Sequence, residues 1–290
     1  MIGPGGPDDF GRVDAAYTAL LGAQVADPWL VLQTVATAAQ RRLLLKGLQL
    51  APGARVLDGG CGYGPVTMEL AAMGPSHITG VDRSSEKIEI ARTVAGELQA
   101  AGAFDPGAEV ELRVGDLCAL EEPDATFDAA VVRFVLEYLP EPGRALAELH
   151  RVIRPGGLCC VVDVEDGLSI SHPAPLPAMA VLMDAFATMS AAQGVDRHIG
   201  RKLAGLLDDA GFDVVGLLVI SQAEYGVSAP GELPRQFLVQ RFANLRADLL
   251  RDGGISAADF DTALAALGTD TTPKTCSIEG HIAAVGARRG

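Results

Sequence analysis

The stretch VLDGGCGYGP, Val56 to Pro65, places four glycines between an acidic residue and a proline, directly after a short apolar run. Glycine carries no Cβ, so a glycine-rich segment can turn sharply and bring its backbone amides against a ligand. Because a strand is expected before this segment and a helix after it, the stretch predicts a loop that binds a nucleotide-type ligand. A turn that binds nothing is the weaker interpretation, since a bare turn rarely needs three spaced glycines.

The spacing of these glycines argues against a dinucleotide site. The fingerprint G-x-G-x-x-G requires glycine at Pro65 if it starts at Gly60, and glycine at Thr67 if it starts at Gly62. The pattern present is D-x-G-x-G-x-G, which begins at Asp58. An oxidoreductase that uses NAD is therefore disfavoured.

Beyond the loop, short β-rich runs alternate with segments of helical periodicity. Six of the seven expected strands are located at 55–57, 77–81, 110–114, 127–134, 158–164 and 277–287, and the expected helices between them are 66–73, 84–101 and 144–153. This alternation predicts an α/β fold with a Rossmann-like, doubly wound sheet of seven mostly parallel strands. Ligands on such sheets bind at the carboxyl ends of the strands, where the strand order reverses.

Helical segments outside this rhythm are expected to cover the ligand. Residues 1–50 carry two helical patterns, the second with Asp27 as its N-cap, and predict N-terminal helices that form part of a lid. Residues 51–290 are expected to form the remaining domain, with cap insertions at about 168–200 and 223–268. Both insertions lie at one end of the predicted sheet, where they would enclose a pocket lined by Leu, Met and Phe.

The composition limits the partners and the compartment. Lys and Arg total 23 against 37 Asp and Glu, and a net charge of −14 without a basic patch argues against nucleic acid. The five cysteines are odd in number, and the adjacent Cys159 and Cys160 lie in an apolar run, which is typical of reduced thiols in a cytoplasmic protein. Without a leader pattern or an apolar run of about 18 residues, no membrane partner is expected. A homo-oligomer is left open.

Four motifs in chain order resemble those of class I S-adenosylmethionine-dependent methyltransferases. They are D-x-G-x-G-x-G, GVDRS with Asp82, VGDLC with Asp116, and the stretch from Phe127 to Gly167 with its proline-glycine-glycine turn. The later segment 194–212 is similar to the small-molecule branch that includes the ubiquinone and menaquinone biosynthesis methyltransferases. The resemblance implies S-adenosylmethionine as the cofactor and S-adenosylhomocysteine as the product.

The resemblance also implies which residues surround the methionine part of the cofactor. Gly60 and Gly62 would lie under the methionine moiety, with Gly59 beside them, and Asp58 would lie near its ammonium group. Tyr17, on the first N-terminal helix, is a candidate lid over the methionine carboxylate. The alternative for Tyr17 is a side chain that packs this helix against the sheet.

For the nucleoside part, the resemblance implies that Asp82 accepts hydrogen bonds from both ribose hydroxyls. The alternative is that Asp82 caps the following helix, a role that Ser84 can also fill. Arg83 would lie along the adenine face. Asp116 would accept from the adenine amine, with the backbone amide of Leu117 nearby.

The acceptor is expected to be a small molecule, such as a secondary or specialised metabolite. Methyltransferases that act on nucleobase amines usually carry a D/N-P-P-Y/F motif after the fourth strand, whereas residues 133–136 read RFVL. The partly apolar cap also suits a compact metabolite better than a protein tail. A protein that binds S-adenosylmethionine without transferring methyl, as a regulatory partner or as the catalyst of a rearrangement, is the alternative.

A metal ion is not expected at the site. Asp163, Glu165 and Asp166 lie near the end of the fifth strand, but residues 163 and 165 share one face while 166 points away if the strand persists. Arg133 at the end of the fourth strand would repel a cation. Alignment of the reactants would therefore supply most of the rate acceleration.

His198 and Arg133 are the candidate catalytic residues. Histidine side chains titrate near neutral pH, so the ring of His198 is a candidate to remove a proton from the acceptor. The backbone around Arg133 and Phe134 is expected to meet the cofactor. Alternatively, Arg133 is a buried partner of Glu137 or Asp163.

Overall fold

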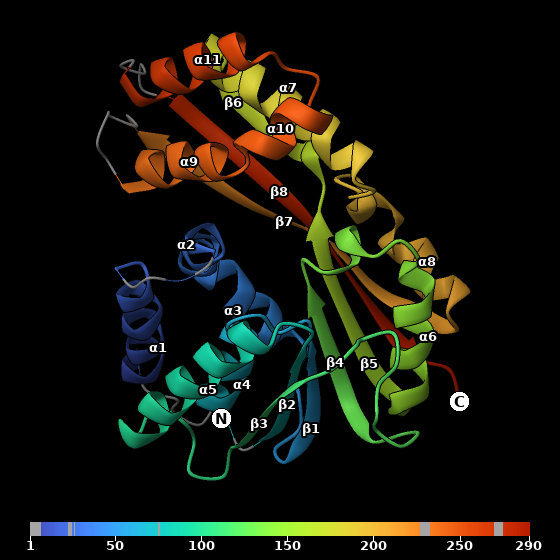
Figure 1. Cartoon of the computed structure of the whole chain (residues 1–290). Helices are drawn as coiled ribbons and strands as arrows, with labels where there is room; N and C mark the ends of the chain where they lie inside the picture. The colour runs from blue at the N-terminus through green and yellow to red at the C-terminus, as the bar shows by residue number, and fades with distance from the viewer. Residues whose placement is uncertain (1–6, 23–24, 26, 75, 227–232, 270–274) are drawn as a thin grey trace.

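The computed structural model describes residues 7–22, 25, 27–74, 76–226, 233–269 and 275–290 (Figure 1). Its strands are β1 (Ala54–Gly59), β2 (Ser76–Asp82), β3 (Glu109–Val114), β4 (Phe127–Arg133), β5 (Ile153–Val164), β6 (Ile170–His172), β7 (Phe212–Gly226) and β8 (Thr275–Arg288). Its α-helices are α1 (Pro7–Leu20), α2 (Pro28–Ala36), α3 (Ala38–Gly47), α4 (Pro65–Met73), α5 (Ser85–Ala100), α6 (Pro142–Val152), α7 (Pro177–Ala192), α8 (Leu203–Asp209), α9 (Leu233–Asn244), α10 (Arg246–Asp252) and α11 (Ala257–Thr269). Short 3₁₀ helices are η1 (Leu136–Tyr138), η2 (Asp166–Leu168) and η3 (Ile199–Lys202).

The strands form one sheet in the order β3, β2, β1, β4, β5, β8, β6, and β7 also pairs with β8. The pairs among β1 to β5 are parallel, and β8 runs antiparallel to β5, β6 and β7. The predicted doubly wound, mostly parallel sheet is therefore confirmed. The described part of the sheet has eight strands rather than seven, because the three-residue β6 pairs with β8 beyond the end of β5.

Both faces of the central strands are buried, which explains their nearly continuous apolar sequences. Leu57 and Val132 pack on one face in a cluster that includes the buried residues of α6 and α8. Val56 and Val131 pack on the opposite face in a cluster that includes residues of α3 and α4. Neighbouring residues thus point to opposite layers, as the two-residue period of a strand requires.

The strand order reverses between β1 and β4, so the carboxyl ends of the strands around this point border one crevice. The segment after β1 is the glycine loop, β2 ends at Asp82, and β4 ends at Arg133. The fold therefore gathers the predicted motifs at one edge of the sheet.

The N-terminal helices lie beside the glycine loop and differ in part from the prediction. Asp27 caps α2, since its Oδ1 accepts a hydrogen bond from the Leu30 amide at 3.0 Å. The sequence predicts one helix from Asp27 to about Leu48, but the structure divides it into α2 and α3. The break falls at Thr37 (φ −101°, ψ 12°), whose hydroxyl donates to the Gln33 carbonyl at 2.7 Å.

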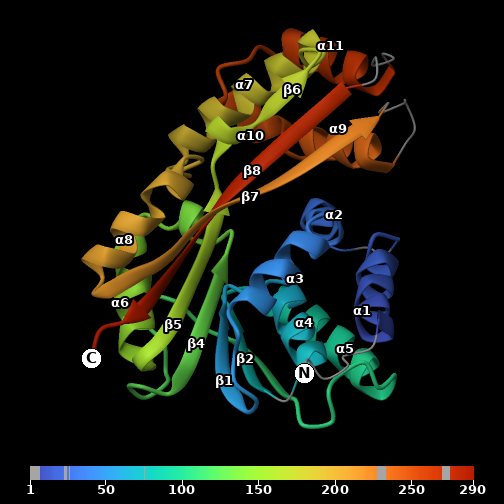
Figure 2. The same ribbon diagram turned by 180° about the vertical axis from the view of Figure 1, so that it is seen from behind.

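Helices α7, α9, α10 and α11 gather around the far ends of β7 and β8, away from the parallel strands (Figures 1 and 2). Their apolar side chains form a separate cluster that includes Leu182, Phe186, Phe242 and Phe260. The described part of the second expected insertion contains α9, α10 and α11. Residues 227–232 of the expected second insertion lie outside the described residues. No helix in the described part of the chain is both long and apolar enough to cross a bilayer.

Candidate functional site

A cavity of about 1160 Å³ runs from the glycine loop to the cap helices. Its walls come from the carboxyl ends of β2, β3 and β4, from α2, and from α7 and α9. It is thus one space with two differently built ends. We call the part beside the glycine loop the cofactor end, and the part beside α7 and α9 the cap end.

The glycine loop turns tightly against β2 and β4. Gly60 has a φ of +70°, and a Cβ placed there would lie 2.3 Å from Cγ2 of Val135, so a side chain would be both strained and obstructed. The amides of Gly60 and Cys61 both donate to the Val81 carbonyl, at 2.7 and 3.0 Å. These two amides therefore fix the loop to β2 instead of pointing at a ligand, contrary to the expectation from the sequence.

Asp82 lines the cofactor end and links the loop to the next helix. Its Oδ2 accepts from the Gly62 amide at 2.8 Å, and its Oδ1 accepts from the Ser84 amide at 2.8 Å. Ser84 itself caps α5, because its hydroxyl accepts from the Lys87 amide at 3.3 Å. Each carboxylate oxygen of Asp82 keeps a further acceptor site for a ligand.

Asp58 is a buried carboxylate at the same end of the cavity. Its Oδ2 accepts from the Thr67 amide at 3.0 Å and from the Thr67 hydroxyl at 2.7 Å. Burial raises the pKa of Asp58 to about 6, against the opposing effect of these two hydrogen bonds. Among the described residues, no cation forms an ion pair with it.

The wall on the β3 side is formed by Arg83, Asp116 and Leu117, and the Asp116 Oδ1 accepts from the Cys118 amide at 2.8 Å. Gly59 lies behind this wall and does not line the cavity. A Cβ on Gly59 would lie 2.8 Å from Cδ1 of Leu117, so this glycine makes room for a cavity residue. Gly59 therefore does not face the cofactor space as predicted, and supports it through Leu117 instead.

Arg133 and Phe134 line the middle of the cavity. Arg133 Nη2 donates to the Thr37 hydroxyl at 2.6 Å, and its guanidinium carbon lies 3.9 Å from the Phe134 ring centre. Burial lowers the pKa of Arg133 to about 9, and the charge of Arg41 adds to this. No ion pair joins Arg133 to Glu137 or Asp163 in the described chain, although the charge of Asp163 acts on the guanidinium and opposes the lowering of its pKa.

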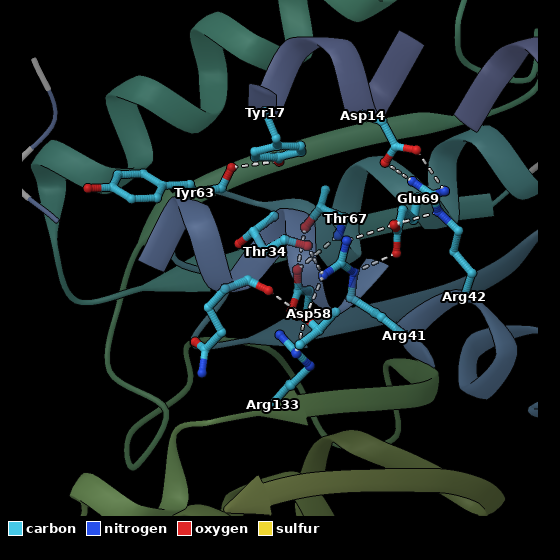
Figure 3. Close-up of polar contacts among 12 residues, drawn as sticks. Asp14, Tyr17, Thr34, Arg41, Arg42, Asp58, Tyr63, Thr67, Glu69 and Arg133 are labelled. Carbon is cyan, nitrogen blue, oxygen red and sulfur yellow. Dashed lines mark hydrogen bonds and ion pairs between the residues drawn. The ribbon is translucent and has the colours of Figure 1, made fainter. Parts of the chain in front are cut away.

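A buried polar network supports the site from behind (Figure 3). Glu69 accepts from Arg41 at 2.6 and 2.8 Å and from Arg42 at 2.8 Å, and Arg41 Nη1 also donates to the Thr34 carbonyl at 3.0 Å. Thr37, which bonds to Arg133, also lies 3.5 Å from Arg41 Nη1. The network therefore joins α2, α3 and α4 to the end of β4.

Tyr17 belongs to this support and not to the cavity wall. Its ring is 1% exposed, and its hydroxyl donates to the carbonyl of Tyr63 in the glycine loop at 2.9 Å (Figure 3). Burial raises the pKa of Tyr17 well above its usual value, so the hydroxyl stays protonated. The expectation that Tyr17 covers the methionine carboxylate is corrected to a role in holding the loop, which is close to the packing alternative.

His198 lies outside the set of residues that line the cavity. Its Nδ1 is 3.0 Å from Oε1 of Glu165, which also binds Arg201, and the imidazole side chain is 53% exposed. The ring is part of a surface ion cluster at the junction of β5 and η3. This placement corrects the expectation that His198 faces the acceptor.

The three carboxylates at the end of β5 do not converge. Asp163 Oδ2 accepts from the Glu137 amide at 3.2 Å, Glu165 binds Arg201, and Asp166 binds Arg197 at 2.8 Å. Within the described residues, no group of three or more His, Cys, Asp or Glu is arranged to hold a metal ion.

Several cavity residues were not singled out from the sequence, because they come from segments far from any motif. His281, on β8, lines the cavity, and its ring centre lies 4.7 Å from that of Phe134. Burial, with the charges of Arg133 and Arg197, lowers the pKa of His281 to about 4. The cap end adds Trp29 and Arg241, which lie beside Phe186 of the expected first cap insertion. For this end, the sequence predicts only two cap insertions and a pocket lined by Leu, Met and Phe.

Comparisons with known protein families and proteins both find methyltransferases. A profile described as a methyltransferase domain matches residues 57–161. The chain is 36% identical over 191 residues to an uncharacterized 37.1 kDa protein in transposon TN4556 of Streptomyces fradiae, covering 65% of this chain and 52% of the relative. It is 29% identical over 204 residues to the O-methyltransferase cnsE of Penicillium expansum, covering 66% and 68%.

A third relative is the ubiquinone/menaquinone biosynthesis C-methyltransferase UbiE of Geotalea daltonii, 30% identical over 125 residues, with 42% of this chain and 51% of the relative covered. The chain thus spans about half the length of two of these three relatives. Among solved structures, the (4+2)-cyclase SpnF has a TM-score of 0.54 at 22% identity, covering 87% of this chain and 81% of the other. A geranyl diphosphate methyltransferase has a TM-score of 0.52 at 16% identity, covering 87% and 78%. At such identities the structures show a shared fold.

Proposed function

The chain belongs to the class I S-adenosylmethionine-dependent methyltransferase family, and from this premise we propose that it transfers a methyl group from S-adenosylmethionine to a small-molecule acceptor. The observation that carries the proposal is the single cavity, which joins the strand-end carboxylates to an apolar cap. The polar end suits a charged nucleoside, and the apolar end suits the body of a metabolite.

The residues at the cofactor end fit this cofactor. Asp58 is a buried carboxylate without an ion-pair partner in the described chain, and the methionine ammonium would supply one. Asp82 has acceptor capacity left for a ribose diol. Arg83, Asp116 and Leu117 would surround the adenine.

The chemistry of transfer comes from the bound cofactor, whose sulfonium makes the methyl group electrophilic. The protein's part is to align the acceptor and to exclude water. We propose that residues 1–50 together with the segments 168–200 and 223–268 close over the cavity as a lid. Contacts between α2 and α9, which bring the N-terminal helices against the cap, support this proposal.

A neutral side chain at the acceptor could take up the proton that transfer releases. His281 is the residue we propose for this role, because burial keeps its ring neutral and it lines the cavity beside Phe134. An oxygen that has just been methylated is strongly acidic, so even a weak base can accept its proton.

The test is to incubate the protein with methyl-labelled S-adenosylmethionine and a metabolite extract, and to follow labelled product and S-adenosylhomocysteine together. Asp82→Ala should lower both signals. Asp213→Ala is the matched control, because it removes the same group from an exposed pair with Arg289. Equal product from Asp82→Ala and the unmodified protein would contradict the assignment.

The alternative is a protein that binds the cofactor without transfer, and the fold that it shares with SpnF is compatible with it. The same experiment separates the two functions. Binding of S-adenosylmethionine without formation of S-adenosylhomocysteine in any extract would favour the alternative, whereas stoichiometric formation of product and S-adenosylhomocysteine would support transfer.

A further inference from the structure

The cap end of the cavity contains one cation that has no acceptor. Arg241, on α9, lines the cavity, and its guanidinium carbon lies 4.4 Å from the Trp29 ring centre and 4.7 Å from the Phe186 ring centre. Within the described chain, no carboxylate pairs with this guanidinium and no oxygen accepts a hydrogen bond from it. Contacts with ring faces stabilise its charge but give its N–H donors no acceptor atom.

No neighbouring charged side chain provides the acceptor that Arg241 lacks. Arg197 is already neutralised, with Nη1 2.8 Å from Glu137 and Nη2 2.8 Å from Asp166. Asp27, whose Oδ1 caps α2, forms no ion pair with Arg241. Burial and the charge of Arg197 lower the pKa of Arg241, which is the direction expected for a cation held without a counter-charge.

We infer that Arg241 anchors a single negatively charged oxygen group of the acceptor, such as a carboxylate, whose apolar body lies among the cap side chains. This inference rests on the proposed function, since it names the class of its acceptor. A guanidinium that is partly desolvated and rich in donors binds oxyanions strongly, with bonds about twice as strong as neutral ones.

The surroundings of Arg241 define the remainder of the acceptor. The cavity wall around it is mostly apolar and includes Met179, Met183, Phe186, Met189, Phe237 and Leu238, with the polar side chains of Ser190, Gln193, Gln240 and Asn244 among them. A second negative charge would meet Glu137 and Asp166, whose carboxylates are buried or half-buried at the same end. The site therefore favours one oxyanion on an apolar frame over a polyphosphate or a neutral alcohol.

Trp29 allows this inference to be tested without knowing the acceptor, because it is the single tryptophan of the chain and contacts Arg241. The probes are octanoate and octanamide, which share an apolar chain and differ in charge. Each is titrated into protein saturated with S-adenosylhomocysteine, and binding is followed by tryptophan fluorescence and calorimetry. Octanoate is expected to bind about tenfold more tightly than octanamide, as for a hydrogen bond to a charged group.

Arg241→Met should remove this preference while keeping an apolar side chain in the cap. Arg241→Lys should keep part of it, since the charge remains but the planar donors are lost. Arg251→Met is the matched control, because it removes the same charge from a surface site paired with Asp248 and Asp252. It should retain the full preference.

Equal affinity for the two probes in the unmodified protein, or no saturable binding of octanoate, would overturn the inference whether or not the variants fold. A preference that persists in folded Arg241→Met would overturn it as well. Calorimetry of S-adenosylhomocysteine alone, in the same samples, reports on the cofactor site. Failure there would count against the proposed function, whereas cofactor binding without octanoate preference would count only against the role of Arg241.

Discussion

The two ends of the cavity are built on different principles. At the cofactor end, the acidic side chains are tied to backbone amides nearby in the fold: Asp58 to Thr67, and Asp82 to both Gly62 and Ser84. These contacts join strand ends to the segments that follow them. A site of this kind is fixed by the path of the main chain.

At the cap end, the walls are side chains of helices that pack through apolar contacts, and the cation Arg241 lies against two aromatic rings without an ion-pair partner among the described residues. Little of the main chain takes part. This difference indicates that one fold can keep the same cofactor end while substitutions of side chains in the cap end change which acceptor binds. Each prediction below tests whether the two ends are separable in this way.

The largest effect on stability is expected in the buried network of Arg41, Arg42 and Glu69, which supports the cofactor end. Arg41→Met should lower the free energy of unfolding by about 3 kcal/mol, because it removes one partner of a buried ion pair and leaves Glu69 bonded only to Arg42. Urea unfolding measures this change. Arg251→Met, on the exposed side of the cap, should leave the midpoint unchanged. Similar unfolding midpoints for both variants would show that the network does not stabilise the cofactor end.

The second effect concerns cofactor binding. Asp82→Ala should weaken the binding of S-adenosylhomocysteine by about 1.5 to 3 kcal/mol, because it removes a charged acceptor and frees the Gly62 amide that this carboxylate fixes. Calorimetry on the folded variant gives the value, with Asp213→Ala as the control. Equal affinity in all three proteins would mean that the ligand does not reach the end of β2.

The same contrast explains what the sequence could predict. Gly60 and Asp82 lie in short motifs directly after predicted strands, so their place at the sheet edge follows from the strand-helix rhythm alone. His198 lies in a junction whose direction depends on how η3 meets Glu165, and that contact spans 33 residues. The break in α2–α3 at Thr37 and the short β6 also depend on tertiary contacts.

For the cap end, the sequence predicts only a pocket lined by apolar side chains. The insertion at about 168–200 is expected to line an apolar pocket, and α7 within it places apolar side chains in the cavity wall and in the cap cluster. Nothing in the sequence near Arg241 indicates its neighbours, since Trp29 and Phe186 come from segments 212 and 55 residues away along the chain. Contacts that join distant segments through side chains leave no local pattern to read.

The third effect is a pH dependence specific to the cofactor end. The pKa of Asp58 is raised to about 6 in the folded protein, so its contribution to folding stability is fully present below about pH 4 and is lost as pH rises through 6. Binding has the opposite sign, because an ammonium group favours the ionised carboxylate. Affinity for S-adenosylhomocysteine should therefore fall about tenfold between pH 7 and pH 5.

Calorimetry across this range measures the affinity, and Asp58→Asn should bind more weakly but with little change between pH 7 and pH 5. The preference for octanoate over octanamide should be retained at pH 6, where both Arg241 and octanoate stay charged. A pH dependence unchanged in Asp58→Asn would assign the titration to another group.

The smallest effect is expected for a single substitution in the cap wall. Met183 on α7 lines the cavity and is 42% exposed, so Met183→Ala should weaken octanoate binding only about threefold, in proportion to the part of the side chain that a ligand would cover. Val181, on the same helix, is 43% exposed but does not line the cavity, and Val181→Ala is the matched control. Because neither residue contacts the strand ends, S-adenosylhomocysteine should bind both variants within about twofold of the unmodified protein. Loss of cofactor binding in folded Met183→Ala would show that the cap also holds the cofactor, and the two ends would then have to be treated as one site.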